Sequence, residues 1–355
     1  MGLDIIRTVQ ALANPEEMYP MYNDENKRKI TWYRSRLDRE TLKSLNQRSD
    51  WKGWLEVLGH LGLVVLTGTA AIYAQGRFPL GVLFLILFFH GTFYAFLGNG
   101  SHELSHNSVF KTRALNTFFY RLFCFLVWRN HGMFSASHGE HHKYTLHPPD
   151  DLEVVLPVEL SVKGFLKNAV ISPWTFYSTL HTTIRLSFGR LTGDWETHLF
   201  TESNRPRQRH LFSWPRVILL GHILIVGFSF YFGFWMLPIL TTFAPFYGGW
   251  LRYLCNGTQH AGLADNIPDF RLCTRTIILN PFLTFLYWHM NYHIEHHMYA
   301  SIPCYNLGKL HKLIKPELPH CPKGLLTAWK QIIAIVKKQR TQPEYQYVPE
   351  LPVQV

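Results

Sequence analysis

The sequence predicts an all-α integral membrane protein with about four transmembrane helices, arranged as two hairpins and capped by a cytosolic helical domain. Three observations predict this fold. Long apolar runs occur in pairs, cations flank these runs on one side only, and histidines recur at helical spacing in the segments between them.

The first hairpin is expected over residues 55–74 and 78–97. Residues 55–74 are almost all apolar or small, and as a helix they would span roughly 30 Å, the thickness of the hydrocarbon core. Only the link Gln75-Gly76-Arg77 separates the two runs. A link this short predicts that both outer ends return to the same side of the membrane.

The second hairpin is expected over residues 217–236 and 238–254. The first of these runs is strongly apolar, whereas the second is interrupted by Pro245, Gly248 and Gly249. Membrane helices tolerate such residues when neighbours satisfy the freed backbone groups. We therefore expect residues 238–254 to span as well, although a soluble fold that buries these runs as core helices is the alternative.

The distribution of charge predicts the orientation. The formal net charge is +11, yet Arg77 is the only lysine or arginine in the two predicted outer tips. Because cations remain on the cytosolic side, both termini and the long central loop are expected there. A basic chain can also indicate nucleic-acid binding, but cations beside apolar runs favour an anionic membrane surface. We therefore expect no nucleic-acid partner, and leave open the endoplasmic reticulum membrane or a bacterial inner membrane.

Three regions follow from this pattern. Residues 1–52 are predicted to form a cytosolic N-terminal arm, residues 53–315 the membrane domain, and residues 316–355 a cytosolic tail that packs loosely. No N-terminal signal peptide is visible, so insertion is expected to use the internal runs. The five cysteines contain no CxxC pair, which excludes a zinc ribbon and an even disulfide framework.

Histidines form three motifs in the predicted cytosolic segments. On a helix, positions i, i+3 and i+4 share one face, so the imidazoles of each motif can point to one site. Two copies of H-x-x-H-H, each with a glutamate before the paired histidines, are difficult to explain by packing alone. The motifs occupy residues 102–106, 138–142 and 293–297, and comprise His102, His106, His138, His141, His142, His293, His296 and His297.

These motifs predict a site for two metal ions on the cytosolic side. Eight imidazoles are too many for one tetrahedral zinc, which takes three or four protein ligands. Imidazole suits iron, copper, nickel and zinc, so the residues alone leave the metal open. Metal-bound histidines commonly donate their other N–H to a carboxylate. The candidate carboxylates are Glu103, Glu140, Asp150, Asp151, Asp265, Asp269 and Glu295.

The sequences HELSH, HGEHH and HIEHH resemble the three histidine boxes of the membrane fatty acid desaturase and hydroxylase superfamily, in order and spacing. The resemblance extends from about Trp51 to Ile314. It implies two iron ions and O2 as co-substrate, acting on an unactivated C–H bond, with no catalytic residue beyond the metal ligands. It further implies that His260 of CNGTQHAGL is a direct ligand and that Asn256 reaches one iron through water.

Among the histidines outside these motifs, there are six in the predicted membrane runs or near the motifs that we do not expect to bind metal. They are His60, His90, His131, His147, His222 and His289.

The resemblance implies an acyl substrate and desaturation, but several alternatives remain. The same iron site could hydroxylate an aliphatic substrate. The stretch MNYHIEHHMYASIPCYNLGKLH also resembles a branch that includes enzymes acting on small non-lipid metabolites. A membrane metal transporter is the non-enzyme alternative, although transporter sites usually lie near the bilayer midplane.

The electron donor is expected to be a separate protein. No HPGG motif of a fused cytochrome b5 domain occurs in the sequence. A ferredoxin or a cytochrome b5 type of donor is therefore implied, and the basic cytosolic face could dock either acidic partner.

Overall fold

The computed structural model describes residues 28–158, 160–201 and 205–353, so residues 1–27 of the predicted N-terminal arm lie outside the described part. Over these ranges the regular elements are helices, and strand-like pairing is limited to isolated bridges. This confirms the predicted all-α class. The chain divides into two compact units.

The first unit, here called the membrane unit, comprises Ser49–Ala136 and Ser161–Tyr253. The helix α8 (His131–Tyr144) contains one unit boundary and α14 (Trp250–Asn256) contains another. The remaining helices of the membrane unit are α4 (Asp50–Ala74), α5 (Leu80–Ala95), α6 (Leu97–Ser105), α7 (Arg113–Leu126), α9 (Val162–Ala169), α10 (Pro173–Ser187), α11 (Gly193–Leu199), α12 (Arg205–Phe232), α13 (Met236–Leu240) and the 3₁₀ helix η2 (Ala244–Phe246).

The second unit, here called the histidine unit, comprises the described parts of Met1–Arg48, Ser137–Leu160 and Leu254–Val355. Its helices are α3 (Arg39–Leu45), α15 (Phe270–Cys273), α16 (Pro281–Leu286), α17 (His293–Met298), α18 (Cys304–Ile314), the 3₁₀ helix η3 (Lys315–Glu317) and α19 (Leu325–Thr341).

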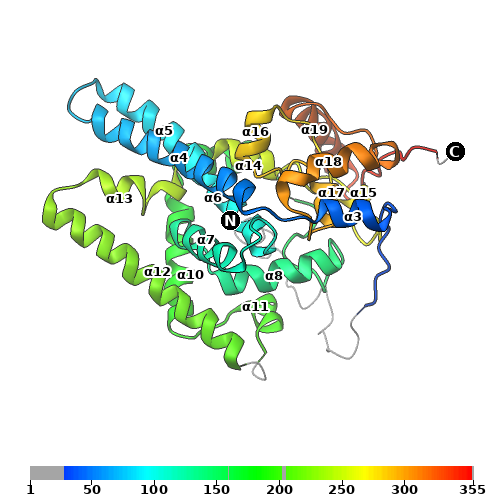
Figure 1. Ribbon diagram of the computed structural model, residues 1–355, viewed down its shortest axis with the longest axis horizontal. Helices are drawn as coiled ribbons and strands as arrows, with labels where there is room; N and C mark the ends of the chain where they lie inside the picture. The colour runs from blue at the N-terminus through cyan, green and yellow to red at the C-terminus, as the bar shows by residue number, and fades with distance from the viewer. Residues whose placement is uncertain (1–27, 159, 202–204, 354–355) are drawn as a thin grey trace. The chain divides into compact units, whose positions relative to one another are not determined.

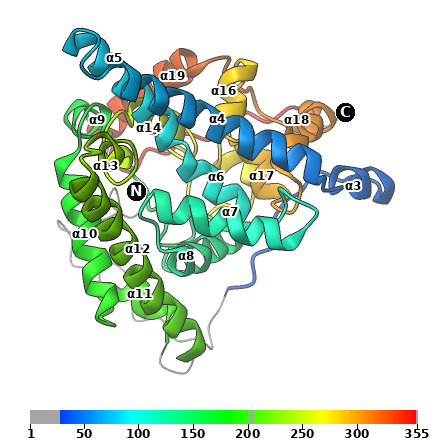
Figure 2. The ribbon, with the colours of Figure 1, turned by 60° about the vertical axis from the view of Figure 1, so that its left-hand side comes forward.

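Three helices in the described part of the chain are long and apolar enough to cross a bilayer: Asp50–Ala74, Leu80–Ser105 and Gln208–Phe232. All three belong to the membrane unit, so the protein is an integral membrane protein. The helices α4 and α5 lie side by side as a hairpin (Figures 1 and 2). Between them the chain turns at Gly76, whose φ of 74° favours glycine. The first predicted hairpin is therefore present, and α12 covers most of the third predicted run.

The fourth predicted run, residues 238–254, differs from the expectation because it is not one helix. It is divided among the end of α13, η2 and the beginning of α14. Pro245 has no backbone N–H to donate within a helix. Gly248 has a φ of 67° and approaches the backbone of α5 so closely that a side chain would not fit. Its N–H donates instead to the carbonyl of Val170, at 2.8 Å.

Three buried histidines in the membrane unit contribute hydrogen bonds rather than a metal-binding cluster. Polar groups in a membrane segment require internal partners, and each of these imidazoles has one. The pairs are His60 Nε2 with Phe93 O at 2.9 Å, His90 Nε2 with Leu240 O at 3.0 Å, and His222 Nδ1 with Thr242 Oγ1 at 3.0 Å.

The C-terminal tail is packed more firmly than the sequence predicted. Its helix α19 buries Ala328, Ile332 and Ile335. The Ile335 side chain packs against Gly262, where a Cβ atom would lie 2.6 Å from it. The prediction of loose packing was wrong, because an amphipathic helix with a basic exposed face resembles a solvated tail in composition.

Candidate metal centre

Two helices carry most of the predicted ligands in the histidine unit. The second motif lies on α8, where His138, His141 and His142 share one face. The third motif forms α17, which begins at His293 and holds all three of its histidines in buried positions. His260 follows α14 in a turn and is also buried. The histidine unit thus brings together seven of the predicted imidazole ligands.

The first group of converging nitrogens contains His141, His260 and His297. One ring nitrogen of each lies within 4.8 Å of the others. His293 adjoins this group, because its Nε2 lies 3.0 Å from His260 Nε2 and 3.2 Å from His297 Nε2. His293 therefore lies beside the three converging imidazoles.

The second group contains His138, His142 and His296, whose nitrogens also lie within 4.8 Å of one another. His142 Nε2 lies 2.9 Å from His138 Nε2 and 3.1 Å from His296 Nε2. The two groups are adjacent, since the His142 and His297 rings stack with centroids 4.5 Å apart.

The outer Nδ1 atoms of His138, His141 and His260 are held by oxygen atoms. His141 Nδ1 lies 2.8 Å from Asp151 Oδ2, and His138 Nδ1 lies 3.0 Å from Glu153 Oε1. His260 Nδ1 lies 3.0 Å from the carbonyl oxygen of Cys273. Because a carbonyl only accepts hydrogen bonds, His260 must carry its proton on Nδ1. Its Nε2 then offers a lone pair towards the centre of the group.

Thr145 fixes the tautomer of His297 by the same reasoning. The Thr145 hydroxyl donates to the carbonyl of His141 at 2.6 Å and lies 3.1 Å from His297 Nδ1. A hydroxyl has one proton, so it must accept from His297 Nδ1–H. The inward Nε2 of His297 is thereby left as a lone pair. Outer N–H donors with inward lone pairs are the arrangement that metal-binding histidines require.

Burial sets the charge of three of these rings. It lowers the pKa of His260 to about 3, and it lowers the pKa values of His293 and His297 well below the usual value. Although burial also acts on His141, the Asp151 carboxylate raises the pKa of that ring. Neutral imidazole is the form that binds a metal ion. The donor set therefore fits metal ions better than it fits a cluster of cations.

The first motif belongs to the membrane unit. His102 lies on α6 and His106 is the residue at its C-terminal end, and their ring centroids are 5.2 Å apart. His102 Nδ1 lies 2.9 Å from Glu103 Oε1. The prediction that these two residues share one site with the other histidines stays a prediction. The same holds for the water-mediated role of Asn256, the last residue of α14.

The seven candidate carboxylates separate into two classes. Glu103 and Asp151 contact predicted ligands, as described above. The remaining five have other partners: Glu140 pairs with Lys143, Asp150 with Arg28, Asp265 with Gln346, Asp269 with Arg271, and Glu295 with His311.

Sequence reasoning missed Glu153, which contacts His138. Its other oxygen accepts a 2.6 Å hydrogen bond from Ser137 Oγ. Glu153 closes the acidic stretch PPDDLE after the second motif, and only that proximity could have indicated it. His311 was also missed, because it lies in sequence well beyond the third motif.

The Glu295 carboxylate anchors α17 from the side opposite its ligands. Its Oε1 lies 2.5 Å from His311 Nδ1, and its Oε2 accepts a 2.5 Å hydrogen bond from Thr276 Oγ1. Thr276 Oγ1 in turn accepts a 3.1 Å hydrogen bond from the backbone N–H of Ile294. These contacts fix the start of the helix that presents three of the predicted ligands.

An N-terminal segment, residues 28–38, covers part of this cluster. Trp32 stacks on Phe270 with ring centroids 4.1 Å apart, and Phe270 packs against His297. The Trp32 indole N–H donates to the carbonyl of Lys143 at 2.8 Å. Tyr33 is held by its hydroxyl, which donates to Glu317 at 2.6 Å. The segment thus shields the predicted ligands from solvent.

Comparison with known proteins decides the family. A family model described as fatty acid desaturase matches residues 77–327, which is well over half of the chain and includes all three histidine motifs. The chain belongs to the fatty acid desaturase family. It is therefore a desaturase-family enzyme with histidine clusters suited to metal ions.

Two curated relatives of this desaturase-family chain come from Caenorhabditis elegans. The Delta(5) fatty acid desaturase fat-4 is 26% identical over 242 residues, covering 60% of this chain and 53% of the relative. The Delta(6)-fatty-acid desaturase fat-3 is 24% identical over 243 residues, covering 61% of this chain and 54% of the relative. The chain thus spans about half the length of the curated relatives that it matches.

Proposed function

We propose that this protein is a membrane-bound, O2-dependent fatty acyl desaturase that introduces a C=C bond by means of two iron ions. The observation that carries this proposal is the orientation of the imidazoles. Outer Nδ1 atoms bond to Asp151, Glu153 and Cys273, while inward Nε2 atoms converge in two adjacent groups. This geometry suits two metal ions, and because the chain belongs to the desaturase family we propose that the metal is iron.

Two ligand sets follow. His141, His260, His293 and His297 would hold one iron, with Asn256 acting through water. His138, His142 and His296 would hold the other, and His102 and His106 are proposed to complete it. When bound, the two irons supply the O2 activation that removes hydrogen from an unactivated C–H bond.

The protein's own residues position and protect this chemistry. Asp151 and Glu153 keep His141 and His138 in the Nδ1–H tautomer, so that their Nε2 atoms stay available. Trp32 and Phe270 exclude water from one side of the cluster, and exclusion of water prevents side reactions of an oxidising site. The acyl chain would enter from the bilayer beside the membrane unit.

The remaining proposals concern topology and partners. We propose that both termini and the histidine unit face the cytosol, because cations flank the spans on that side. Electrons would come from a separate ferredoxin or cytochrome b5 type of donor. An acyl substrate is favoured over a small metabolite, because both curated relatives are named fatty acid desaturases.

Product analysis tests this proposal. The purified protein, supplied with an acyl substrate, O2 and a reducing partner, should give a product that has lost two hydrogen atoms. A product that has gained one oxygen atom would support the hydroxylase alternative and contradict desaturation.

Two ligand variants and one control sharpen the test. His141→Ala and His296→Ala should each abolish turnover and lower bound iron. His320→Ala is the matched control, because His320 is exposed on the same unit. Full activity in either ligand variant would overturn the assignment of these histidines as ligands. An equal loss of turnover and bound iron in the control would overturn it as well.

A further inference from the structure

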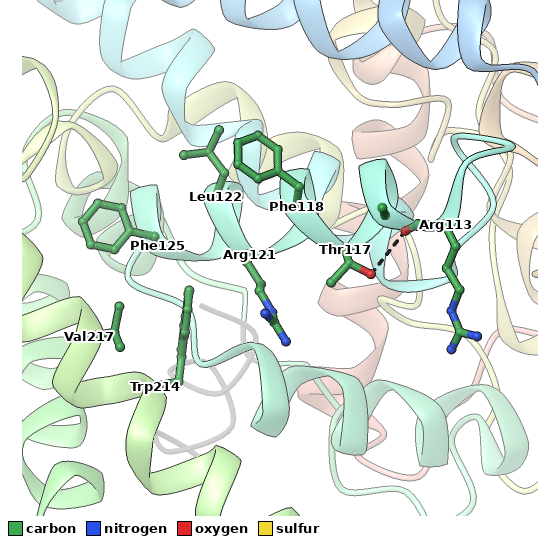
Figure 3. A pocket seen from close by; sticks show the side chains of 9 residues that line it. Arg113, Thr117, Phe118, Arg121, Leu122, Phe125, Trp214 and Val217 are labelled. Atoms are coloured by element: carbon green, nitrogen blue, oxygen red, sulfur yellow. Dashed lines mark hydrogen bonds between the residues drawn. The ribbon is translucent and has the colours of Figure 1, made fainter.

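A groove in the membrane unit is lined by none of the residues of the histidine motifs. It has a volume of about 650 Å³, within the range of about 300–1,000 Å³ that is usual for small-molecule sites. Figure 3 shows that one wall comes from α7 and the other from α12. Its lining residues are Arg113, Ala114, Thr117, Phe118, Arg121, Leu122, Phe125, Trp214 and Val217.

The α7 wall of this groove consists of two parallel rows. Arg113, Thr117 and Arg121 are four residues apart and form a polar row. The adjacent row is apolar and includes Phe118 and Leu122. Both arginine side chains extend to the same side of α7 (Figure 3). The groove therefore pairs a cationic edge with an apolar edge along its length.

The cationic edge has no neutralising partner within the described part of the chain. Arg113 and Arg121 are exposed, and neither side chain forms an ion pair with a described acidic residue. No aspartate or glutamate lines the groove. An anionic group placed between the two guanidinium groups would gain charge-assisted hydrogen bonds to both. The Thr117 hydroxyl lies between them in sequence and donates to the carbonyl of Arg113 at 3.2 Å (Figure 3), so the two guanidinium groups are the donors that this edge offers to an anion.

The opposite wall places the groove at the membrane surface. Trp214 and Val217 lie within about three turns of the start of the span Gln208–Phe232. The Trp214 indole N–H donates to the carbonyl of Arg129 at 3.0 Å, and tryptophan is enriched at the boundary between bilayer and water. Beyond it α12 exposes Val217, Leu220 and Leu224, so the apolar edge continues towards lipid.

The groove is anchored at one end by a close helix contact. Phe125 of α7 packs so closely against Gly221 of α12 that no side chain would fit at that glycine. The same Phe125 ring stacks on His222, with centroids 4.6 Å apart. This contact keeps the walls together near Phe125, so the groove is part of the packed fold.

We propose that this groove binds an anionic membrane phospholipid, with its phosphate between Arg113 and Arg121 and its acyl chains against Phe118, Leu122 and Val217. Two cations match the single phosphate of a phospholipid better than the several phosphates of a water-soluble nucleotide. The absence of an acidic lining residue disfavours a zwitterionic headgroup, whose ammonium group would lie beside the arginines. The site is independent of the desaturation chemistry.

Native mass spectrometry of the full chain in detergent tests this site. Phosphatidylglycerol is titrated against the protein, and phosphatidylcholine is titrated in parallel. We expect phosphatidylglycerol to bind more tightly, and the double variant Arg113→Gln/Arg121→Gln to weaken its binding on the order of tenfold or more. The control Lys163→Gln/Lys167→Gln removes the same charge from exposed positions of α9 and should leave binding unchanged.

Three results would overturn the proposal. If both double variants lost phosphatidylglycerol binding equally, the binding would reflect general charge attraction. Equal binding of the two lipids would indicate no preference for an anion. The third result is displacement of phosphatidylglycerol by glycerophosphoglycerol, the same headgroup without acyl chains, at equal concentration. That displacement would identify a site for soluble phosphates rather than for a lipid.

Discussion

His141 Nδ1 lies 2.8 Å from Asp151 Oδ2, and both side chains are almost completely buried. Asp151 also accepts the backbone N–H groups of Leu146 and Glu153. The backbone therefore holds the Asp151 carboxylate in place, and the carboxylate in turn orients the His141 imidazole. This relationship is the best-defined support for a predicted ligand, and the first prediction rests on it.

Replacing Asp151 with Asn should weaken iron binding by about 10- to 100-fold, because the amide holds the His141 tautomer less firmly. Competition with a coloured iron chelator measures the affinity. Asp265→Asn is the matched control, since Asp265 accepts its hydrogen bond from Gln346 at an exposed position. Unchanged affinity in Asp151→Asn would show that the carboxylate does not support the ligand.

The second prediction concerns the coupling of Glu295 and His311. Glu295→Gln and His311→Ala should each lower the free energy of unfolding by about 1–3 kcal/mol, because each leaves a buried polar partner unsatisfied. The double variant should lose less than the sum of the two single losses. Thermal unfolding in detergent provides the comparison, and strictly additive losses would contradict a direct interaction.

The third prediction concerns the segment that covers the histidine cluster. Trp32→Ala removes the stacking on Phe270 and the hydrogen bond to Lys143. Hydrogen exchange should then accelerate at residues 143–147 and 268–272, which Trp32 and Tyr33 contact. Trp174→Ala, at an exposed position of α10, should leave exchange there unchanged. Unaltered exchange in Trp32→Ala would mean that the segment does not shield the cluster.

Two glycines on α5 give the fourth prediction. A Cβ atom at Gly91 would collide with the backbone and ring of Tyr247, whereas at Gly81 it would meet open space. Gly91→Ala should therefore destabilise the protein by about 1–3 kcal/mol. Gly81→Ala should be neutral or stabilising by up to about 1 kcal/mol, because alanine favours helix. Equal melting temperatures for the two variants would contradict the packing of α5 against residue 247.

The sequence predicted the features that depend on local pattern. Length and hydropathy located α4, α5 and α12, because a bilayer selects continuous apolar helices. Residues 238–254 could not be predicted in this way. Their course depends on the hydrogen bond from Gly248 to Val170, which joins residues far apart in sequence.

In the candidate site too, some features follow from local pattern and others depend on contacts between residues far apart in sequence. Spacing alone selected the histidines of the three motifs, since i, i+3 and i+4 share a helical face. The partners that orient them are tertiary contacts. Glu153 lies beyond the second motif and His311 beyond the third, so no periodicity connects either residue to the site. Asp151 could be named as a candidate only because histidine ligands generally need a carboxylate.

The metal content of the purified full chain tests the central claim most directly. Inductively coupled plasma mass spectrometry, combined with a protein concentration from amino-acid analysis, gives the ratio of each metal to the chain. Two converging groups of imidazoles predict about two metal ions per chain, and membership of the desaturase family makes iron the expected metal. His141→Ala and His296→Ala should each lower this ratio, whereas His320→Ala should not. A single zinc ion per chain, with iron absent, would contradict the account.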